Sequence, residues 1–109
     1  MRRGDIVVVS VSGDYGKPRP AVIIQANLFN DTHASIIVCL LTTDIQDAPL
    51  FRLDIDPSDS NGLKKRSQIM VDKIVAMRRD RINSTIGKID DDTLIRVNRS
   101  LALFLGLAQ

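Results

Sequence analysis

The chain has 109 residues, of which 44% are hydrophobic and 26% charged, and its formal net charge at pH 7 is +2. This length fits a single globular domain, residues 1–109, that buries ~60–70% of its unfolded surface. No apolar run reaches the ~18–20 residues of a membrane span, and the N-terminus lacks the apolar core of a signal peptide. We therefore expect a cytoplasmic protein that does not bind a membrane.

Hydrophobic patterning predicts a series of strands. The β-branched segment 5–11 indicates a first strand, and the segment 12–16 indicates a turn. The run 36–41 is apolar without alternation, as a strand buried on both faces is, whereas 51–55 alternates strictly and predicts a half-exposed strand. The expected strands cover residues 5–11, 21–25, 36–41, 51–55, 67–72 and, as a short sixth, 84–89, with a helical turn around residues 28–29.

The C-terminus changes to a helical period. Asp90 is placed to cap a helix, and two further aspartates favour the positive end of its dipole. An apolar stripe then continues to about Gly106, at Leu94, Val97, Leu101, Phe104 and Leu105. Strands followed by one closing helix predict a mostly β member of the α+β class, a compact antiparallel sheet or barrel with a C-terminal capping helix. Because several strands are apolar on both faces, we expect a second copy of the chain to cover part of the surface.

Charge is unevenly distributed along the chain. Residues 64–83 contain seven basic residues and two aspartates, whereas residues 44–59 contain five aspartates and one arginine. A local basic cluster on a nearly neutral chain suits a polyanion or an acidic peptide. A solvated face without a ligand is the alternative interpretation.

The single cysteine and the single histidine exclude several classes of enzyme. Cys39 lies in an apolar run, and we expect a buried structural thiol there rather than a nucleophile. His33 lies in a polar segment without matching metal ligands, and we expect a loop residue. Neither a Ser-His-Asp nor a Cys-His arrangement has a supporting motif. The sequence predicts no metal and no cofactor, and what remains is a site of cationic and hydroxyl groups.

Arg19 stands between two prolines, at the start of the apolar segment 21–25. Proline fixes its own φ and keeps the residue before it extended. A guanidinium held in this way loses little entropy on binding and can donate two parallel hydrogen bonds to a phosphate. The alternative is a surface arginine in an ordinary turn.

Four motifs and the terminal helix follow one another in a recognisable order: Arg-Gly-Asp-Ile-Val at 3–7, Arg-Pro-Ala-Val-Ile-Ile at 19–24, Leu-Thr-Thr at 41–43, and Ser-Gln-Ile-Met-Val-Asp-Lys-Ile at 67–74. This order resembles the MazF/PemK (Kid) family of toxin endoribonucleases from bacterial toxin–antitoxin pairs. The resemblance extends over essentially the whole chain, and its signal is the ordered set rather than any one motif.

The resemblance implies an SH3-like β-barrel, a homodimer, and metal-independent cleavage of single-stranded RNA. It also implies a cognate antitoxin that covers the RNA groove with an acidic tail. The usual catalytic pair of the family falls on Arg19 and Thr42. The acidic residue that takes part in proton transfer in some members falls on Asp72.

Two departures from the family pattern change these expectations. The loop between the first two strands is shorter than usual, which leaves its RNA contacts in question. Met70 stands where some members have an arginine, so an Asp-plus-Arg proton-transfer pair is not available on that strand. Cleavage is therefore expected to depend more on Arg19 and Thr42.

RNA carries its own nucleophile, the ribose 2′-hydroxyl. We expect Arg19 to stabilise the pentacoordinate transition state and Thr42 to donate its hydroxyl to a non-bridging oxygen. Asp72 is a candidate acceptor of the 2′ proton if the site raises its pKa. The alternative is that Asp72 pairs with Lys73 or Arg66.

Substrate binding is expected from residues that surround this pair. Cations can follow the RNA backbone, and an aromatic ring can stack on a base. Tyr15 is the first candidate for stacking and Phe51 the second, whereas Phe104 is expected in the core. The candidate binding residues are Tyr15, Lys17, Thr43, Lys65, Arg66 and Lys73, together with Lys64.

Two other functions stay open at this point. A CcdB-like gyrase poison has the same fold, but its functional tail ends in Trp-Gly-Ile and this chain contains no tryptophan. A relative that binds RNA or an antitoxin without cutting is favoured by the short first loop and disfavoured by the presence of Arg19 and Thr42.

Overall fold

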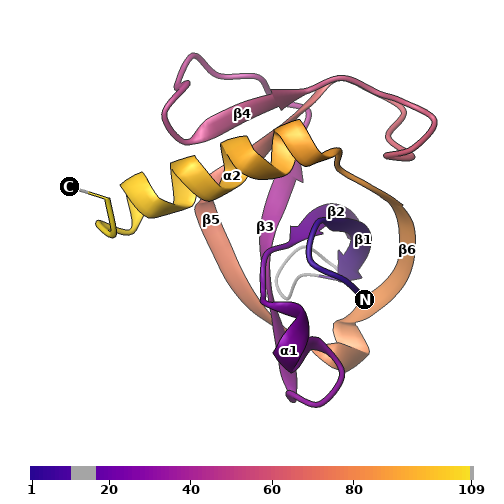
Figure 1. Cartoon of the computed structure of the whole chain (residues 1–109). Helices are drawn as coiled ribbons and strands as arrows, with labels where there is room; N and C mark the ends of the chain where they lie inside the picture. Colours follow the sequence, from indigo (N-terminus) through magenta and orange to yellow (C-terminus); the bar gives the residue numbers. More distant parts are fainter. Residues whose placement is uncertain (11–16, 109) are drawn as a thin grey trace.

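The structure is a computed structural model that describes residues 1–10 and 17–108, so the expected turn at 12–16 and the candidate Tyr15 lie outside the described residues. Most of the chain forms strands, and the long helix comes last (Figure 1). In chain order they are β1 (Asp5–Ser10), β2 (Pro18–Ile23), α1 (Asn27–Asn30), β3 (Ser35–Thr42), β4 (Arg52–Ile55), β5 (Ser67–Arg78), η1 (Arg79–Arg81), β6 (Ile82–Lys88) and α2 (Asp91–Phe104).

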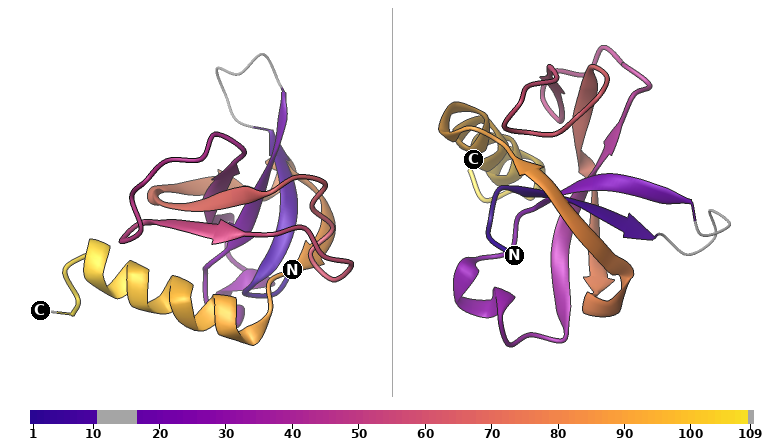
Figure 2. Two further views of the ribbon diagram at one scale, coloured as in Figure 1. Left: turned by 90° about the horizontal axis from the view of Figure 1, so that it is seen from above. Right: turned by 90° about the vertical axis from the view of Figure 1, so that its right-hand side faces the viewer.

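The strands form one antiparallel sheet in the order β4-β5-β3-β2-β1-β6. The sheet is strongly curled, and α2 lies across it (Figure 2). Among the described residues β4 and β6 are its two edges and do not pair with each other. The expected antiparallel strands and capping helix are therefore confirmed, and the barrel is open rather than closed.

Two hydrophobic clusters lie on opposite faces of the sheet. Ile6 and Cys39 belong to the cluster that α2 covers, whereas their neighbours Val7 and Val38 belong to the other cluster. Successive residues of a strand point to opposite faces, so β1 and β3 contribute apolar side chains to both clusters. Ile37 is the exception on β3, with 38% of its surface exposed.

The helix α2 begins as the sequence predicts. The Asp90 carboxylate accepts a hydrogen bond from the Thr93 N–H at 2.7 Å, which caps the first turn. Val97 and Leu101 of the apolar stripe are buried against the sheet. Phe104 is 47% exposed, so the expectation that it lies in the core is wrong; the end of the stripe extends past the sheet of its own chain.

Two strands differ from their expected bounds: β5 is longer than 67–72, and β2 begins before residue 21 and ends at Ile23 rather than at residue 25. β2 begins at Pro18, since its proline-rich start pairs with β1. The prolines lack N–H donors, but the ladder to β3 begins only at Ala21, so β2 makes no pairing on that side before this residue. β5 continues to Arg78 because the first half of β3 pairs with it. Within the described chain, no helix is long and apolar enough to cross a membrane.

Cys39 is fully buried, and burial raises the pKa of its thiol to about 12. Because the thiolate is the reactive form, we expect iodoacetamide at pH 8 to leave the native protein unmodified and to label it once urea has unfolded it. Mass spectrometry at timed intervals measures this difference. Labelling of the native protein at the rate of a small free thiol would contradict the structural role.

Candidate functional site

Four polar side chains lie in one row across neighbouring strands, which we call the polar row: Arg19 of β2, Thr42 of β3, Gln68 of β5 and Asp54 of β4. The ladders pair Thr42 with Gln68 and Gln68 with Asp54. The adjacent Leu53 and Ile69 point into the cluster beneath α2. By alternation, the polar row therefore occupies the sheet face that α2 leaves uncovered.

Arg19 joins the row through the pairing of β2. It lies opposite Val9 in the ladder to β1. On the other side the last pair of the ladder is Ala21 with Leu40, and Arg19 and Thr42 each lie two residues beyond that pair, on the same face as its members. Arg19 itself is half-buried and lies in the strand between two prolines. The structure thus brings the two expected catalytic residues onto adjoining strands and the same face.

Thr42 is the last residue of β3, and its side chain is tied to the chain that follows. Its Oγ1 accepts a hydrogen bond from the Asp44 N–H at 3.0 Å. A hydroxyl that accepts one bond still has its own proton to donate. Thr43 is exposed beside it. The Thr42 Oγ1 is therefore tied to Asp44, and its own proton remains to be donated.

Gln68 is a member of the row that the sequence interpretation did not include. It is 2% exposed, and its amide bonds the chain after Thr42. Its oxygen accepts from the Gln46 N–H at 3.0 Å, and its nitrogen donates to the Gln46 carbonyl and to Asp54, each at 2.8 Å. A glutamine among the apolar residues of a strand was the available signal, since a buried amide needs hydrogen-bond partners.

Asp72 forms an ion pair with Arg52, a partner that was not considered from the sequence. The guanidinium donates two hydrogen bonds, at 2.8 and 3.0 Å, and the two side chains are only 9% and 19% exposed. This bonding lowers the pKa of Asp72 and raises that of Arg52. The condition for proton acceptance, a raised pKa at Asp72, is therefore not met. The expected alternatives, Lys73 and Arg66, do not supply the bonds that set this shift.

Arg66, expected to bind RNA, is engaged by carboxylates. It contacts Asp54 at 2.8 Å and Asp56 at 3.6 Å, and all three side chains are exposed. The hydrogen bond from Gln68, with the charge of Arg66, lowers the pKa of Asp54. The acidic and basic segments of the sequence thus lie side by side and partly neutralise each other. The other cations expected to bind RNA are exposed: Lys17, Lys64, Lys65 and Lys73.

Two residues weighed for other roles have structural contacts. Phe51 packs against Phe104 with ring centroids 5.8 Å apart, so its ring is engaged within the chain. His33 lies in an exposed loop, as expected, and contacts Ser35. In the described part of the chain, no three His, Cys, Asp or Glu side chains gather as metal ligands.

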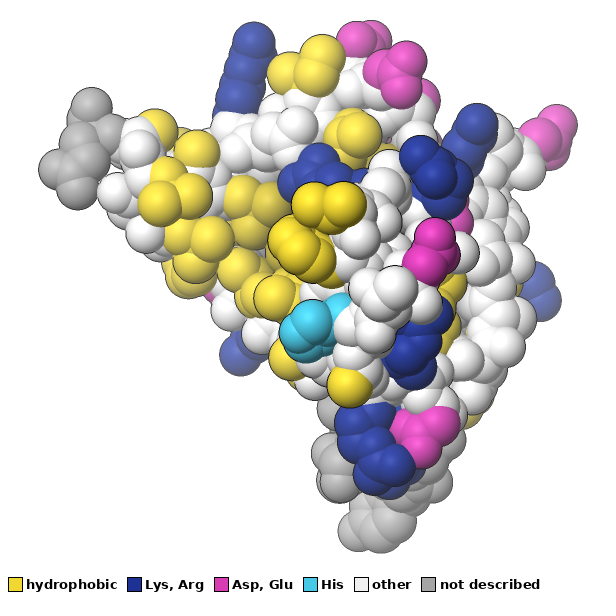
Figure 3. Space-filling view, turned by 60° about the horizontal axis from the view of Figure 1, so that its bottom comes forward, with side chains coloured by type: hydrophobic (Ala, Val, Ile, Leu, Met, Phe, Trp, Pro, Cys, Tyr) yellow, Lys and Arg dark blue, Asp and Glu magenta, His cyan; other side chains and the backbone are white. Residues whose placement is uncertain are grey.

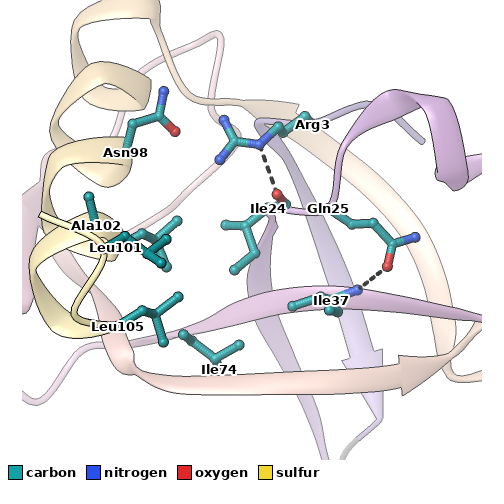
Figure 4. Close-up of a pocket in the computed structure, with 10 residues that line it drawn as sticks. Arg3, Ile24, Gln25, Ile37, Ile74, Asn98, Leu101, Ala102 and Leu105 are labelled. Atoms are coloured by element: carbon teal, nitrogen blue, oxygen red, sulfur yellow. Dashed lines mark hydrogen bonds between the residues drawn. The ribbon is translucent and has the colours of Figure 1, made fainter.

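A separate apolar pocket of ≈ 420 Å³ lies between the sheet and the end of α2 (Figure 4). Ile37 of β3, Ile74 of β5 and Ile24, which directly follows β2, face Leu101 and Leu105 at the end of α2 across it. Its rim carries Arg3, whose Nε donates to the Ile24 carbonyl at 2.8 Å. The pocket has no residue in common with the polar row.

Comparison with known proteins identifies the family of the chain. Residues 2–105 match the family described as "PemK-like, MazF-like toxin of type II toxin-antitoxin system". A "Probable endoribonuclease MazF" from Mycolicibacterium smegmatis is 41% identical over 109 residues, which cover 99% of each chain. "Endoribonuclease EndoA" from Bacillus subtilis is 28% identical, covering 98% of this chain and 96% of its own.

A solved structure has the same fold. An "Endoribonuclease in complex with its cognate antitoxin from Mycobacterial species" superposes with a TM-score of 0.84 at 24% identity, covering 100% of this chain and 98% of its own. The family match and the 41% identical relative together establish the assignment. The chain belongs to the PemK-like, MazF-like toxin family of type II toxin–antitoxin systems.

The Arg52–Asp72 pair predicts a pH-dependent contribution to stability. Because the pKa of Asp72 is lowered in the folded state, the pair stabilises above the ordinary carboxyl pKa and is lost as pH falls through the folded value. At pH 7, Asp72→Asn should reduce the free energy of unfolding by about 1–3 kcal/mol, since a largely buried guanidinium loses its charged partner.

Urea unfolding of the parent and the variant at pH 7 and pH 3 measures this effect. The difference between them should shrink at pH 3, and the exposed Asp47→Asn should change stability by less than about 0.5 kcal/mol. An equal difference at both pH values would contradict the ion-pair account.

Proposed function

We propose that this MazF-like toxin cleaves single-stranded RNA on the polar row, with Arg19 and Thr42 as the catalytic residues. The endoribonuclease activity follows from membership of the family and from the endoribonuclease relatives. The site assignment is supported by the pairing of β2 with β3, which ends at Ala21 and Leu40, so that Arg19 and Thr42 follow at the adjoining ends of the two strands and, by alternation, on the same face. The similarities give no support to a gyrase poison.

Cleavage on this face requires that the reacting groups of the RNA are oriented and that the charge developing on the phosphate oxygens is stabilised. The 2′-hydroxyl gives up its proton to water and attacks the neighbouring phosphorus, the bond from phosphorus to the 5′-oxygen breaks as the new bond forms, and the leaving oxygen takes up a proton from water, which yields a 2′,3′-cyclic phosphate and a 5′-hydroxyl. Arg19 offers two parallel N–H donors to the oxygens that gain charge. Thr42 donates its hydroxyl proton to a non-bridging oxygen, while its Oγ1 accepts the hydrogen bond from the Asp44 N–H.

Asp72 takes a different part from that of a proton acceptor. Its carboxylate is bonded by Arg52 at both oxygens, and its lowered pKa makes it a weak base. A weak base adds little to proton transfer at neutral pH. We assign Asp72 to holding Arg52 in place beside the row, so that the site keeps a fixed cation in addition to Arg19.

The RNA strand is expected to follow the exposed cations around the row. Lys17 directly precedes β2, Lys65 lies shortly before β5, and Lys73 lies within β5. Arg66 can bind a phosphate only in competition with Asp54 and Asp56. Exposed Thr43 adds a hydroxyl next to Thr42. We place this activity in the cytoplasm, under the control of a cognate antitoxin that competes for the same face.

A second copy of the chain is the proposed cover for the apolar pocket. Hydrophobic side chains gather in a broad band on this face of the molecule (Figure 3). Exposed apolar residues near the pocket include Ile37, Leu105 and Leu107, which are 38%, 54% and 77% exposed. A contiguous apolar patch of this kind marks an association surface. In a homodimer that buries this pocket, the polar row of each chain lies outside the pocket.

The catalytic assignment predicts the effects of two substitutions. Arg19→Ala and Thr42→Ala should each lower kcat on a single-stranded RNA by ~10²–10³, because each removes a donor to the developing charge. Fluorogenic RNA cleavage in the presence of a chelator, with end analysis of the products, measures the rate and the expected cyclic phosphate.

The matched controls are Arg99→Ala and Thr85→Ala, exposed residues of α2 and β6 outside the polar row. Both should cut at the rate of the parent. Correctly folded Arg19→Ala and Thr42→Ala proteins that cut as fast as the parent would refute the assignment.

The homodimer predicts a change in mass. Leu105→Asp places a charge in the apolar pocket, where burial without a partner is costly, and should convert a two-chain particle into a single chain in sedimentation experiments. Leu103→Asp, at a helix position 49% exposed and outside this pocket, should leave the mass unchanged. A single-chain parent at micromolar concentration would exclude this proposal.

A further inference from the structure

We propose that Gln68 is a positioning residue for Thr42, acting through the segment of chain that follows β3. This inference rests on the proposed function, because it concerns the placement of a catalytic hydroxyl. Gln68 is not expected to touch the RNA, since its side chain is buried and all of its bonds are made within the protein.

Beyond the end of β3, the Gln68 side-chain amide bonds the backbone of the chain as a residue of a neighbouring strand would. Its oxygen and nitrogen bond the N–H and the carbonyl of Gln46, which is the two-bond pattern that a paired strand residue offers. Its remaining N–H donates to Asp54 at 2.8 Å. Both polar atoms of the amide are therefore engaged, and two of the three bonds hold one exposed loop residue.

Gln68 holds both ends of the turn that orients the Thr42 hydroxyl. At one end the backbone of Thr42 pairs with that of Gln68 in the ladder, and at the other end Gln46 is held by the Gln68 side chain. The Asp44 N–H that bonds Thr42 Oγ1 lies between these two fixed points. Fixing residues 43–45 at both ends therefore fixes the hydroxyl, because its rotation depends on the position of Asp44.

The burial of Gln68 does not by itself require an amide. Ile69 and Val71 in the same strand are buried and apolar, and an apolar side chain of similar length would fill the space of Gln68. The bonds lost on such a replacement go to Gln46 and Asp54, two exposed residues whose polar groups can bond water instead. The main expected cost is thus freedom of the loop after Thr42, and its consequence is catalytic.

The test replaces Gln68 with methionine, which keeps the length of the side chain and removes the amide. Single- and multiple-turnover cleavage of a fluorogenic RNA should show kcat lowered ~10–100-fold, as a displaced catalytic group gives, with KM within about twofold of the parent. Gln46→Pro, which removes the N–H whose hydrogen bond Gln68 accepts, should lower kcat in the same way, and Gln46 is exposed.

The matched control is Asn61→Leu. Asn61 is another buried amide, 4% exposed, that holds a different loop through Asp56, Ser58 and Leu63. Urea unfolding of both variants reports their loss of stability. A merely structural role for Gln68 predicts that the two variants behave alike, whereas the positioning role predicts that only Gln68→Met lowers kcat.

A double-mutant cycle identifies the group through which Gln68 acts. In a Thr42→Ala background, Gln68→Met should cause almost no further loss of kcat, since the hydroxyl that it positions is gone. Additive losses, or an unchanged kcat in both Gln68→Met and Gln46→Pro, would overturn the inference while leaving the proposed function intact. A Thr42→Ala protein with the parent's rate would overturn both.

Discussion

The pairing register of β2, β3, β5 and β4 is the constraint on which the account depends. Each ladder fixes which residues lie opposite one another, and a shift by one residue would turn every side chain to the other face. In the register that the protein adopts, Arg19, Thr42, Gln68 and Asp54 share one row. The apolar residues that alternate with them hold this register, because they fill two buried clusters. Packing of the core and placement of the site are thus the same event.

The two faces of the sheet are specialised for different contacts. One carries α2 and an apolar pocket that reaches the surface, and the other carries the polar row. Charge follows the same division: Arg52 and Arg66 are held by aspartates on the side of the row. The pairing of Arg66 moderates the positive charge that the sequence concentrates in residues 64–83. RNA binding on this face then depends on the placement of a few donors more than on bulk charge.

The sequence predicts more of the fold than of the site. Alternation and run length locate every strand, and Asp90 marks the start of α2, because these signals are local. The full length of β5 is not local, since its second half is a strand only in the presence of β3. The same limit applies to side-chain partners. The bidentate pair of Arg52 with Asp72 joins residues 20 apart, and nothing near either residue indicates the other. Gln68 was visible as a polar residue in an apolar strand, but its partner Gln46 was not.

The most direct test of the central claim is a structure of the protein with a single-stranded RNA that carries a 2′-deoxy sugar at the cleavage position, which removes the nucleophile and keeps the strand intact. Our account predicts that the scissile phosphate lies within hydrogen-bond distance of both Arg19 and Thr42, on the face away from α2. An RNA bound over α2 or in the apolar pocket, with no phosphate near either residue, would contradict it.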